Sequence, residues 1–149
     1  MDGNLSARVL VCGGAVGLVV NTGEFLLNGV LLHGEWGTVM QSLGRPPPGG
    51  ASIASLTVMT FLLGIATMWL YVNLRRACDT DREAVLRTAL VSWLFAYGLG
   101  FGWSWALGVF PLSLYLPTLV WSGLELLLGT LVGARLHAWR RPVLGGGLG

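Results

Sequence analysis

The chain has 149 residues, of which 54% are hydrophobic and only 11% are charged, and its mean hydropathy is +0.70. Soluble domains carry about 25% charged residues, so the composition excludes an ordinary soluble domain and indicates a single-domain integral membrane protein. The formal charge of +2 is too small to predict a nucleic-acid partner. All nine basic residues are arginines, which we interpret as the codon bias of a GC-rich bacterial genome.

Four apolar segments are long enough to span a bilayer, which takes about 20 residues. They cover residues 8–32, 52–74, 88–110 and 116–138. We therefore expect an all-α fold, a bundle of four transmembrane helices that run antiparallel, up and down, within one domain over residues 1–141. The Gly-rich tail, residues 142–149, is expected to be disordered.

The loops carry further signals. In the first loop, residues 33–51, the side chains of Trp36, Val39, Met40 and Leu43 have helical spacing. This spacing predicts a short amphipathic helix on the membrane surface, which the following proline run ends. The second loop, residues 75–87, is rich in arginine and acidic residues, and the third is a tight turn near Pro111.

The arginines predict the orientation in the membrane, because cytoplasmic loops carry the excess of basic residues. Eight of the nine lie at the two termini or in the second loop, and only Arg45 lies on the other side. The eight are Arg8, Arg75, Arg76, Arg82, Arg87, Arg135, Arg140 and Arg141. We expect a multi-pass protein of the bacterial inner membrane with both termini in the cytoplasm and the lipid bilayer as its first partner.

Each predicted helix has one face of small, hydroxylated or polar residues, which on the first and last helix lies within about 80°. In chain order the faces are Gly13, Gly17, Asn21, Glu24 and Asn28; Thr57, Thr60, Gly64, Thr67 and Tyr71; Trp93, Tyr97, Gly100, Ser104 and Gly108; and Thr118, Ser122, Glu125, Gly129 and Gly133. Such residues line helix–helix contacts in membranes, so these faces are expected to form the interior of the bundle.

Two acids stand out within these faces. Glu24 lies about 13 Å, and Glu125 about 12 Å, below the outer ends of their helices, so the two carboxyl groups are expected at similar depth. The candidate ligand- or ion-binding residues are these two acids, the amides one turn on either side of Glu24, and the hydroxyls at the same level on the middle helices. They are Glu24, Glu125, Asn21, Asn28, Thr60 and Ser104.

An ionised carboxylate at mid-membrane costs several kcal/mol, and no Arg lies at that depth. Either at least one acid stays protonated, or a cation, a water chain or a ligand lies between the two. The pair is then either a site that responds to protons or cations, or a neutral hydrogen-bonded pair that only specifies helix packing. Both interpretations stay open.

The remaining chemistry is sparse. His33 and His137 are expected at opposite membrane faces and cannot share one iron, and no nucleophile with its base, Cys pair or phosphate-binding loop is present. We therefore expect no cofactor and no metal site, and an enzyme is disfavoured. The leading hypothesis is a carrier or sensor that binds or moves a proton, a cation or a small polar solute. The alternative is a non-catalytic accessory or assembly subunit of a larger membrane complex. A homodimer through Gly13 and Gly17 is also compatible with the pattern.

The segment from Asn21 to Leu32, the following Glu35-Trp36 with the proline-rich loop, and the late segment from Trp121 to Glu125 resemble a group of small bacterial membrane proteins. That group is an uncharacterised family of four-helix integral membrane proteins, of the kind labelled domain of unknown function. The resemblance implies an inner-membrane location and assigns no chemistry.

Overall fold

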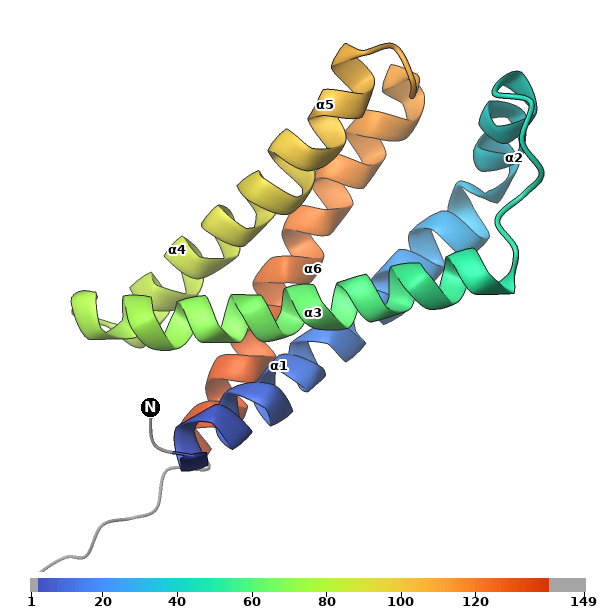
Figure 1. The fold of residues 1–149 in the computed structure, drawn as a ribbon. Helices are drawn as coiled ribbons and strands as arrows, with labels where there is room; N and C mark the ends of the chain where they lie inside the picture. The colour runs from blue at the N-terminus through green and yellow to red at the C-terminus, as the bar shows by residue number, and fades with distance from the viewer. Residues whose placement is uncertain (1–2, 140–149) are drawn as a thin grey trace, which may run out of the picture.

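The computed structural model describes residues 3–139, and almost all of them are helical (Figure 1). Four helices are long and apolar enough to cross a membrane, Leu5–Leu31, Gly50–Ala77, Asp81–Ala106 and Leu112–Trp139. The four predicted spans are thus confirmed, and the described residues contain no strand. Arg140, Arg141 and the tail at 142–149 lie outside the described residues.

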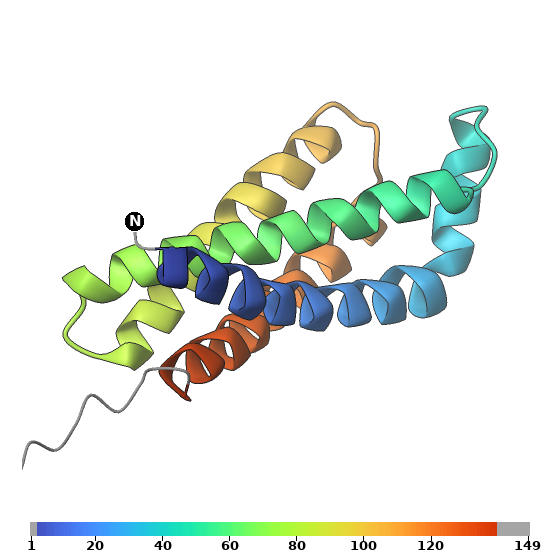
Figure 2. The ribbon, with the colours of Figure 1, turned by 60° about the horizontal axis from the view of Figure 1, so that its bottom comes forward.

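The long helices are divided into shorter elements. Helix α1 (Gly3–Glu24) continues as the π-helical segment η1 (Phe25–Leu31), and α2 (His33–Ser42) follows after a change of direction at Leu32. Helix α3 (Gly50–Leu74) ends in the 3₁₀ turn η2 (Arg75–Ala77). Helix α4 (Asp81–Trp93) continues through a second π-helical segment, η3 (Leu94–Leu99), into α5 (Gly100–Ala106), and α6 (Leu112–Trp139) completes the bundle. Helix α1 packs on α3 and α6, and α4 packs on α6 and α3 (Figures 1 and 2).

Glycines let the backbones of α1 and α3 meet. A Cβ atom placed on Gly64 would lie 2.5 Å from the Gly13 carbonyl oxygen and 2.5 Å from the Gly17 nitrogen. A Cβ atom on Gly13 would in turn lie 2.5 Å from the Ile65 Cα. Glycine at these positions permits the short interhelical distance that favours van der Waals packing in membranes. The Gly13 and Gly17 face is therefore used within the chain, against α3.

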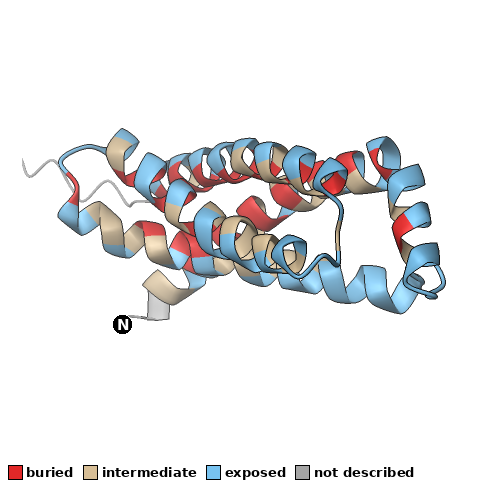
Figure 3. Cartoon of the chain, turned by 90° about the horizontal axis from the view of Figure 1, so that it is seen from above, coloured by how far each residue is buried: buried red, intermediate tan, exposed pale blue. Residues whose placement is uncertain are grey.

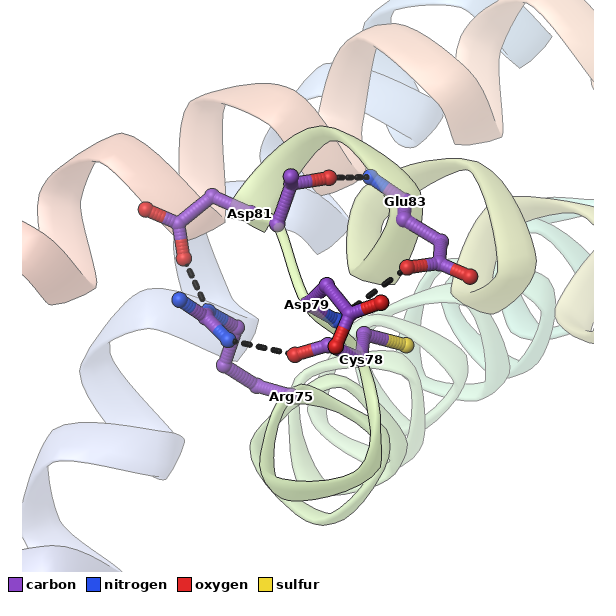
Figure 4. A network of polar contacts seen from close by, with 6 residues as sticks. Arg75, Cys78, Asp79, Asp81 and Glu83 are labelled. Atoms are coloured by element: carbon purple, nitrogen blue, oxygen red, sulfur yellow. Dashed lines mark hydrogen bonds and ion pairs between the residues drawn. The ribbon is translucent and has the colours of Figure 1, made fainter.

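The connection between α3 and α4 is shorter than the predicted loop at 75–87, because α4 begins at Asp81 (Figure 4). The Thr80 hydroxyl accepts a hydrogen bond from the Glu83 backbone N–H at 3.1 Å, and the Glu83 carboxylate accepts one from the Asp79 N–H at 3.2 Å. Thr-x-x-Glu is the sequence signature of a helix N-terminus, and the prediction overlooked it. Arg75 closes the turn through an ion pair with Asp81 and a 2.9 Å hydrogen bond to the Cys78 carbonyl.

Buried residues occupy the helix faces that are turned toward one another, whereas the outward faces are exposed (Figure 3). The larger core cluster includes Val16, Met68 and Leu126 from α1, α3 and α6. A second, smaller cluster contains Val39 of α2 and Leu114 of α6, with Trp36 packed against it. Part of the apolar face of α2 therefore packs on the protein itself.

The close contact of α1 and α3 at Gly64 can be tested by its effect on stability. Gly64→Ala should lower the free energy of unfolding by about 1–3 kcal/mol, because the added methyl group overlaps the α1 backbone and overpacking costs this much. Thermal unfolding in detergent micelles, followed by circular dichroism, measures the change.

Gly14→Ala is the matched control, since a Cβ atom on Gly14 meets nothing within 4 Å. Alanine is the better helix former, so this variant should keep or gain stability, by up to about 1 kcal/mol. Equal losses in the two variants would contradict the close packing of α1 on α3.

Candidate functional site

The candidate site lies beside two π-helical segments, η1 and η3. Glu24 is the last residue of α1, directly before η1, and Tyr97 lies within η3. A π-helical turn is wider than an α-helical turn, and such segments are frequent at functional sites. Both helices thus depart from regular α-helix at the residues that contact each other across the bundle.

Both oxygens of the Glu24 carboxyl group accept hydrogen bonds. The Tyr97 hydroxyl donates to Oε1 at 2.5 Å, and the Asn28 side-chain amide donates to Oε2 at 2.5 Å. The Trp36 indole N–H then donates to the Asn28 amide oxygen at 2.8 Å. This chain of hydrogen bonds joins α1, η1, η3 and α2, so the position of the acid depends on three separate parts of the sequence.

Glu125 is buried in a different way. Its side chain is 7% exposed, and neither carboxyl oxygen has a hydrogen-bond partner among the described residues. The carboxyl group lies against the α1 backbone at Gly23, where a Cβ atom on residue 23 would overlap Oε1. The Trp121 indole lies nearby, but its N–H donates to the Gly23 carbonyl at 3.2 Å. Leaving a buried polar group without a partner costs about 1–3 kcal/mol, and more if the group is charged.

The two acids and Tyr97 form one electrostatic cluster. The Glu125 carboxyl group lies against Gly23, the residue before Glu24, and the Tyr97 hydroxyl donates to the Glu24 carboxyl group. The two salt bridges of the described chain, Arg75 with Asp81 and Arg87 with Glu83, lie at the other end of the helices. No described Arg or His side chain forms an ion pair with either buried acid.

Among the described residues, the other sequence candidates form their hydrogen bonds outside this cluster. The Asn21 amide donates to the Gly17 carbonyl at 2.9 Å and points toward α3, where the Thr57 carbonyl lies at 3.5 Å. The Thr60 hydroxyl donates to the Leu56 carbonyl of its own helix at 2.9 Å. The backbone carbonyl of Ser104 accepts from the Val109 N–H in the turn that follows α5. The structure thus gathers Glu24, Asn28 and Glu125, and it gives the other three candidates separate roles.

Sequence reasoning missed the roles of Tyr97, Trp36 and Gly23. Tyr97 stood in the predicted polar face of its helix, but the level of Glu24 was assigned to the region from Gly100 to Ser104, three to seven residues later. Trp36 was interpreted as part of an interfacial helix. The glycine at residue 23 lies outside the polar face of α1, so nothing in the spacing singled it out.

A row of stacked aromatic rings lies beyond the hydrogen bonds, toward the α5–α6 turn. Trp36 packs edge-on against Phe110 with ring centroids 5.3 Å apart, and Phe110 stacks on Phe101 at 5.1 Å. The row continues from Phe101 to Tyr115 at 5.9 Å and from Tyr115 to Trp105 at 5.5 Å. Aromatic pairs of this geometry contribute about 0.5–1.5 kcal/mol each. The row fixes the Trp36 ring and, through Asn28, the Glu24 carboxyl group.

The potential ligand atoms of the cluster are mainly oxygens. Within residues 3–139, no three His, Cys, Asp or Glu side chains come together as a multidentate metal site would require. Two carboxyl groups, one phenol and one amide can hold a proton or a hard cation with a small charge. The arrangement is thus suited to binding charge.

Removal of the phenol tests the hydrogen bond to Glu24. Tyr97→Phe should lower the free energy of unfolding by about 1.5–3 kcal/mol, the range for hydrogen bonds to charged groups. Chemical unfolding in mixed micelles measures the loss. In a Glu24→Gln background the loss should be smaller, because the two residues are coupled.

Tyr115→Phe is the control for this variant. The Tyr115 hydroxyl lies 3.5 Å from the Gly98 carbonyl, at the limit of hydrogen bonding, so its loss should stay within about 0.5 kcal/mol. Similar losses in the two tyrosine variants would show that Tyr97 does not hold Glu24 in place.

Comparisons of the chain with protein-family models, with curated proteins and with solved structures give no match. The resemblance to an uncharacterised family of four-helix membrane proteins therefore stays a prediction. The geometry of the described residues is the basis for assigning a function.

Proposed function

We propose that this chain is an integral protein of the bacterial inner membrane that binds a proton, a small cation or a small polar solute at Glu24 and Glu125, as a carrier or a sensor. The observation that carries the proposal is the Glu125 carboxyl group, which is buried with both oxygens unpartnered among the described residues. It lies within electrostatic reach of a second acid. An acidic side chain inside a membrane costs free energy, and such residues usually mark a functional site.

The two acids have different surroundings, which suggests different roles. Glu24 receives a donor at each oxygen, an arrangement suited to an ionised carboxylate. No described residue makes a well-formed hydrogen bond to Glu125, whose neighbour Trp121 donates to the Gly23 carbonyl, so a proton, a cation or a polar solute can complete its coordination. In the proposed function, Glu24 carries the resident negative charge and Glu125 takes up and releases the ligand.

The proposed membrane arrangement is an antiparallel, up-and-down bundle with both termini in the cytoplasm and α2 at the outer interface. Arg8 donates to the His137 carbonyl at 2.7 Å and so joins the start of α1 to the end of α6. The α3–α4 turn with Arg75 and Arg76 lies at this same end, and the loop with Arg45 lies at the opposite end (Figures 1 and 2). The arginine distribution therefore supports a cytoplasmic location of the first end.

The pH dependence of stability tests the proposal. An ionised Glu125 without a partner destabilises the folded state, so the folded protein should bind more protons than the unfolded one. The free energy of unfolding should then fall as the pH is raised, with a slope of up to about 1.4 kcal/mol per pH unit for one proton. Glu125→Gln should remove this slope, because the amide imitates the protonated acid.

Glu35→Gln is the matched control, since Glu35 is exposed on α2, and it should leave the slope unchanged.

Addition of Na⁺ at high pH, compared with bulky N-methylglucamine at equal ionic strength, should restore stability if a small cation replaces the proton. If Glu24→Gln and Glu125→Gln both retain the pH dependence of the unmodified protein, the two acids only specify packing. Co-purification of a larger partner under mild solubilisation would instead favour an accessory subunit.

A further inference from the structure

An apolar groove runs between α1 and α6 directly beside Glu125. It encloses about 480 Å³, within the range of about 300–1,000 Å³ that is usual for ligand sites. Its walls are formed largely by four leucines, two from each side of the groove. They are Leu18, Leu26, Leu124 and Leu128. All four are exposed on the outside of the bundle, so in a membrane the groove opens toward the lipid.

The polar side chains that line the groove differ in whether they have hydrogen-bond partners. The Thr22 hydroxyl donates to the Leu18 carbonyl of its own helix at 2.8 Å and needs no further partner. The Trp121 indole N–H donates to the Gly23 carbonyl. Glu125 also lines the groove, and both its oxygens are buried and have no partner in the described part of the chain. Among these polar groups of the groove, the Glu125 carboxyl group is therefore the one that lacks hydrogen-bond partners within residues 3–139.

Gly23 determines how the acid lies between the groove and the bundle interior. Because residue 23 has no side chain, the Glu125 carboxyl group rests against the α1 backbone, and both residues line the groove. Glu24, the next residue of α1, lies on the interior side within electrostatic reach of the same carboxyl. Glu125 thus separates a lipid-facing apolar groove from the interior acidic cluster.

We infer that the groove between α1 and α6 binds a lipophilic cation that enters from the bilayer and places its charge at Glu125. The inference rests on the proposed function and names the class of ligand for the same site. Apolar walls match a hydrophobic body, and two neighbouring carboxyl groups provide the complementary charge. The Trp121 ring, which lines the groove, adds a favourable cation–π surface. The ligand reaches the carboxyl oxygens by rotation of the Glu125 side chain toward the groove.

Two ions of the same shape and opposite charge test the inference. Radiolabelled tetraphenylphosphonium should bind to the purified protein in dodecyl maltoside micelles, with protein-free micelles as the blank in equilibrium dialysis. Tetraphenylborate should bind at least tenfold more weakly, and Glu125→Gln should weaken tetraphenylphosphonium binding at least tenfold. Equal binding of both ions, or unchanged binding to Glu125→Gln, would show that the groove takes only lipid chains or detergent and would overturn the inference.

A second pair of variants tests the location without altering the acid. Leu124→Trp fills the groove and should weaken tetraphenylphosphonium binding at least tenfold. Val120→Trp is its control, because Val120 is on the same helix and similarly exposed, at 65% against 62% for Leu124, and does not line the groove. Loss of binding in both variants, or in neither, would place the cation elsewhere and overturn the inference.

These outcomes separate the inference from the proposed function. If Glu125→Gln abolishes the pH dependence of stability while tetraphenylphosphonium fails to bind, the acidic site stands and the lipophilic ligand is wrong. If Glu24→Gln and Glu125→Gln both retain the pH dependence and neither changes tetraphenylphosphonium binding, the proposed function and the inference are both wrong. If the pH dependence is retained but tetraphenylphosphonium binding still requires the Glu125 carboxylate, the site binds a cation without proton coupling.

Discussion

A buried carboxyl group must find its hydrogen-bond partners within the protein, and the end of this bundle that contains α2 is built around that requirement. Glu24 is held by Tyr97 and Asn28, and Asn28 is held by Trp36. Each partner comes from a different element, so the acid determines how η1, α2 and η3 lie together. The aromatic row from Trp36 to Trp105 then fixes the last of these partners.

The other end depends on a different interaction. There α1 and α3 approach through Gly13, Gly17 and Gly64, and the larger core cluster is mostly apolar, with Tyr71 buried in it. Van der Waals packing of this kind has no ligand to bind and no proton to exchange. The bundle thus combines a closely packed end near the arginines with a polar, aromatic end that holds the acids. Glu24 therefore lies beyond the glycine contact along α1, and Glu125 lies beside Gly23.

Much of this could be predicted from the sequence, because hydrophobic length and helical spacing are strong signals. The four long apolar helices and the buried glycines of α1, α3 and α6 follow from them. Gly100 and Gly108, which were expected in the interior, are exposed. Of the two amides placed one turn from Glu24, Asn28 donates to its carboxyl group, whereas Asn21 donates to the Gly17 carbonyl. The contact of Glu24 with Tyr97 did not follow, because depth was counted at a constant rise per residue, and the π-helical segments and the crossing of the helices change the level at which residues meet. The start of α4 was missed because the apolar pattern was used alone, although Thr80 and Glu83 carry a capping signal.

The contact of Gly23 with Glu125 has a consequence for how this site is inherited. A side chain on residue 23 and a long acid on residue 125 occupy the same space. In related chains the two positions should therefore change together, with glycine at the first wherever glutamate stands at the second, and a larger residue only beside a shorter one. This pairing of substitutions distinguishes a distant relative that keeps the acidic site from a four-helix membrane protein that shares only the apolar composition.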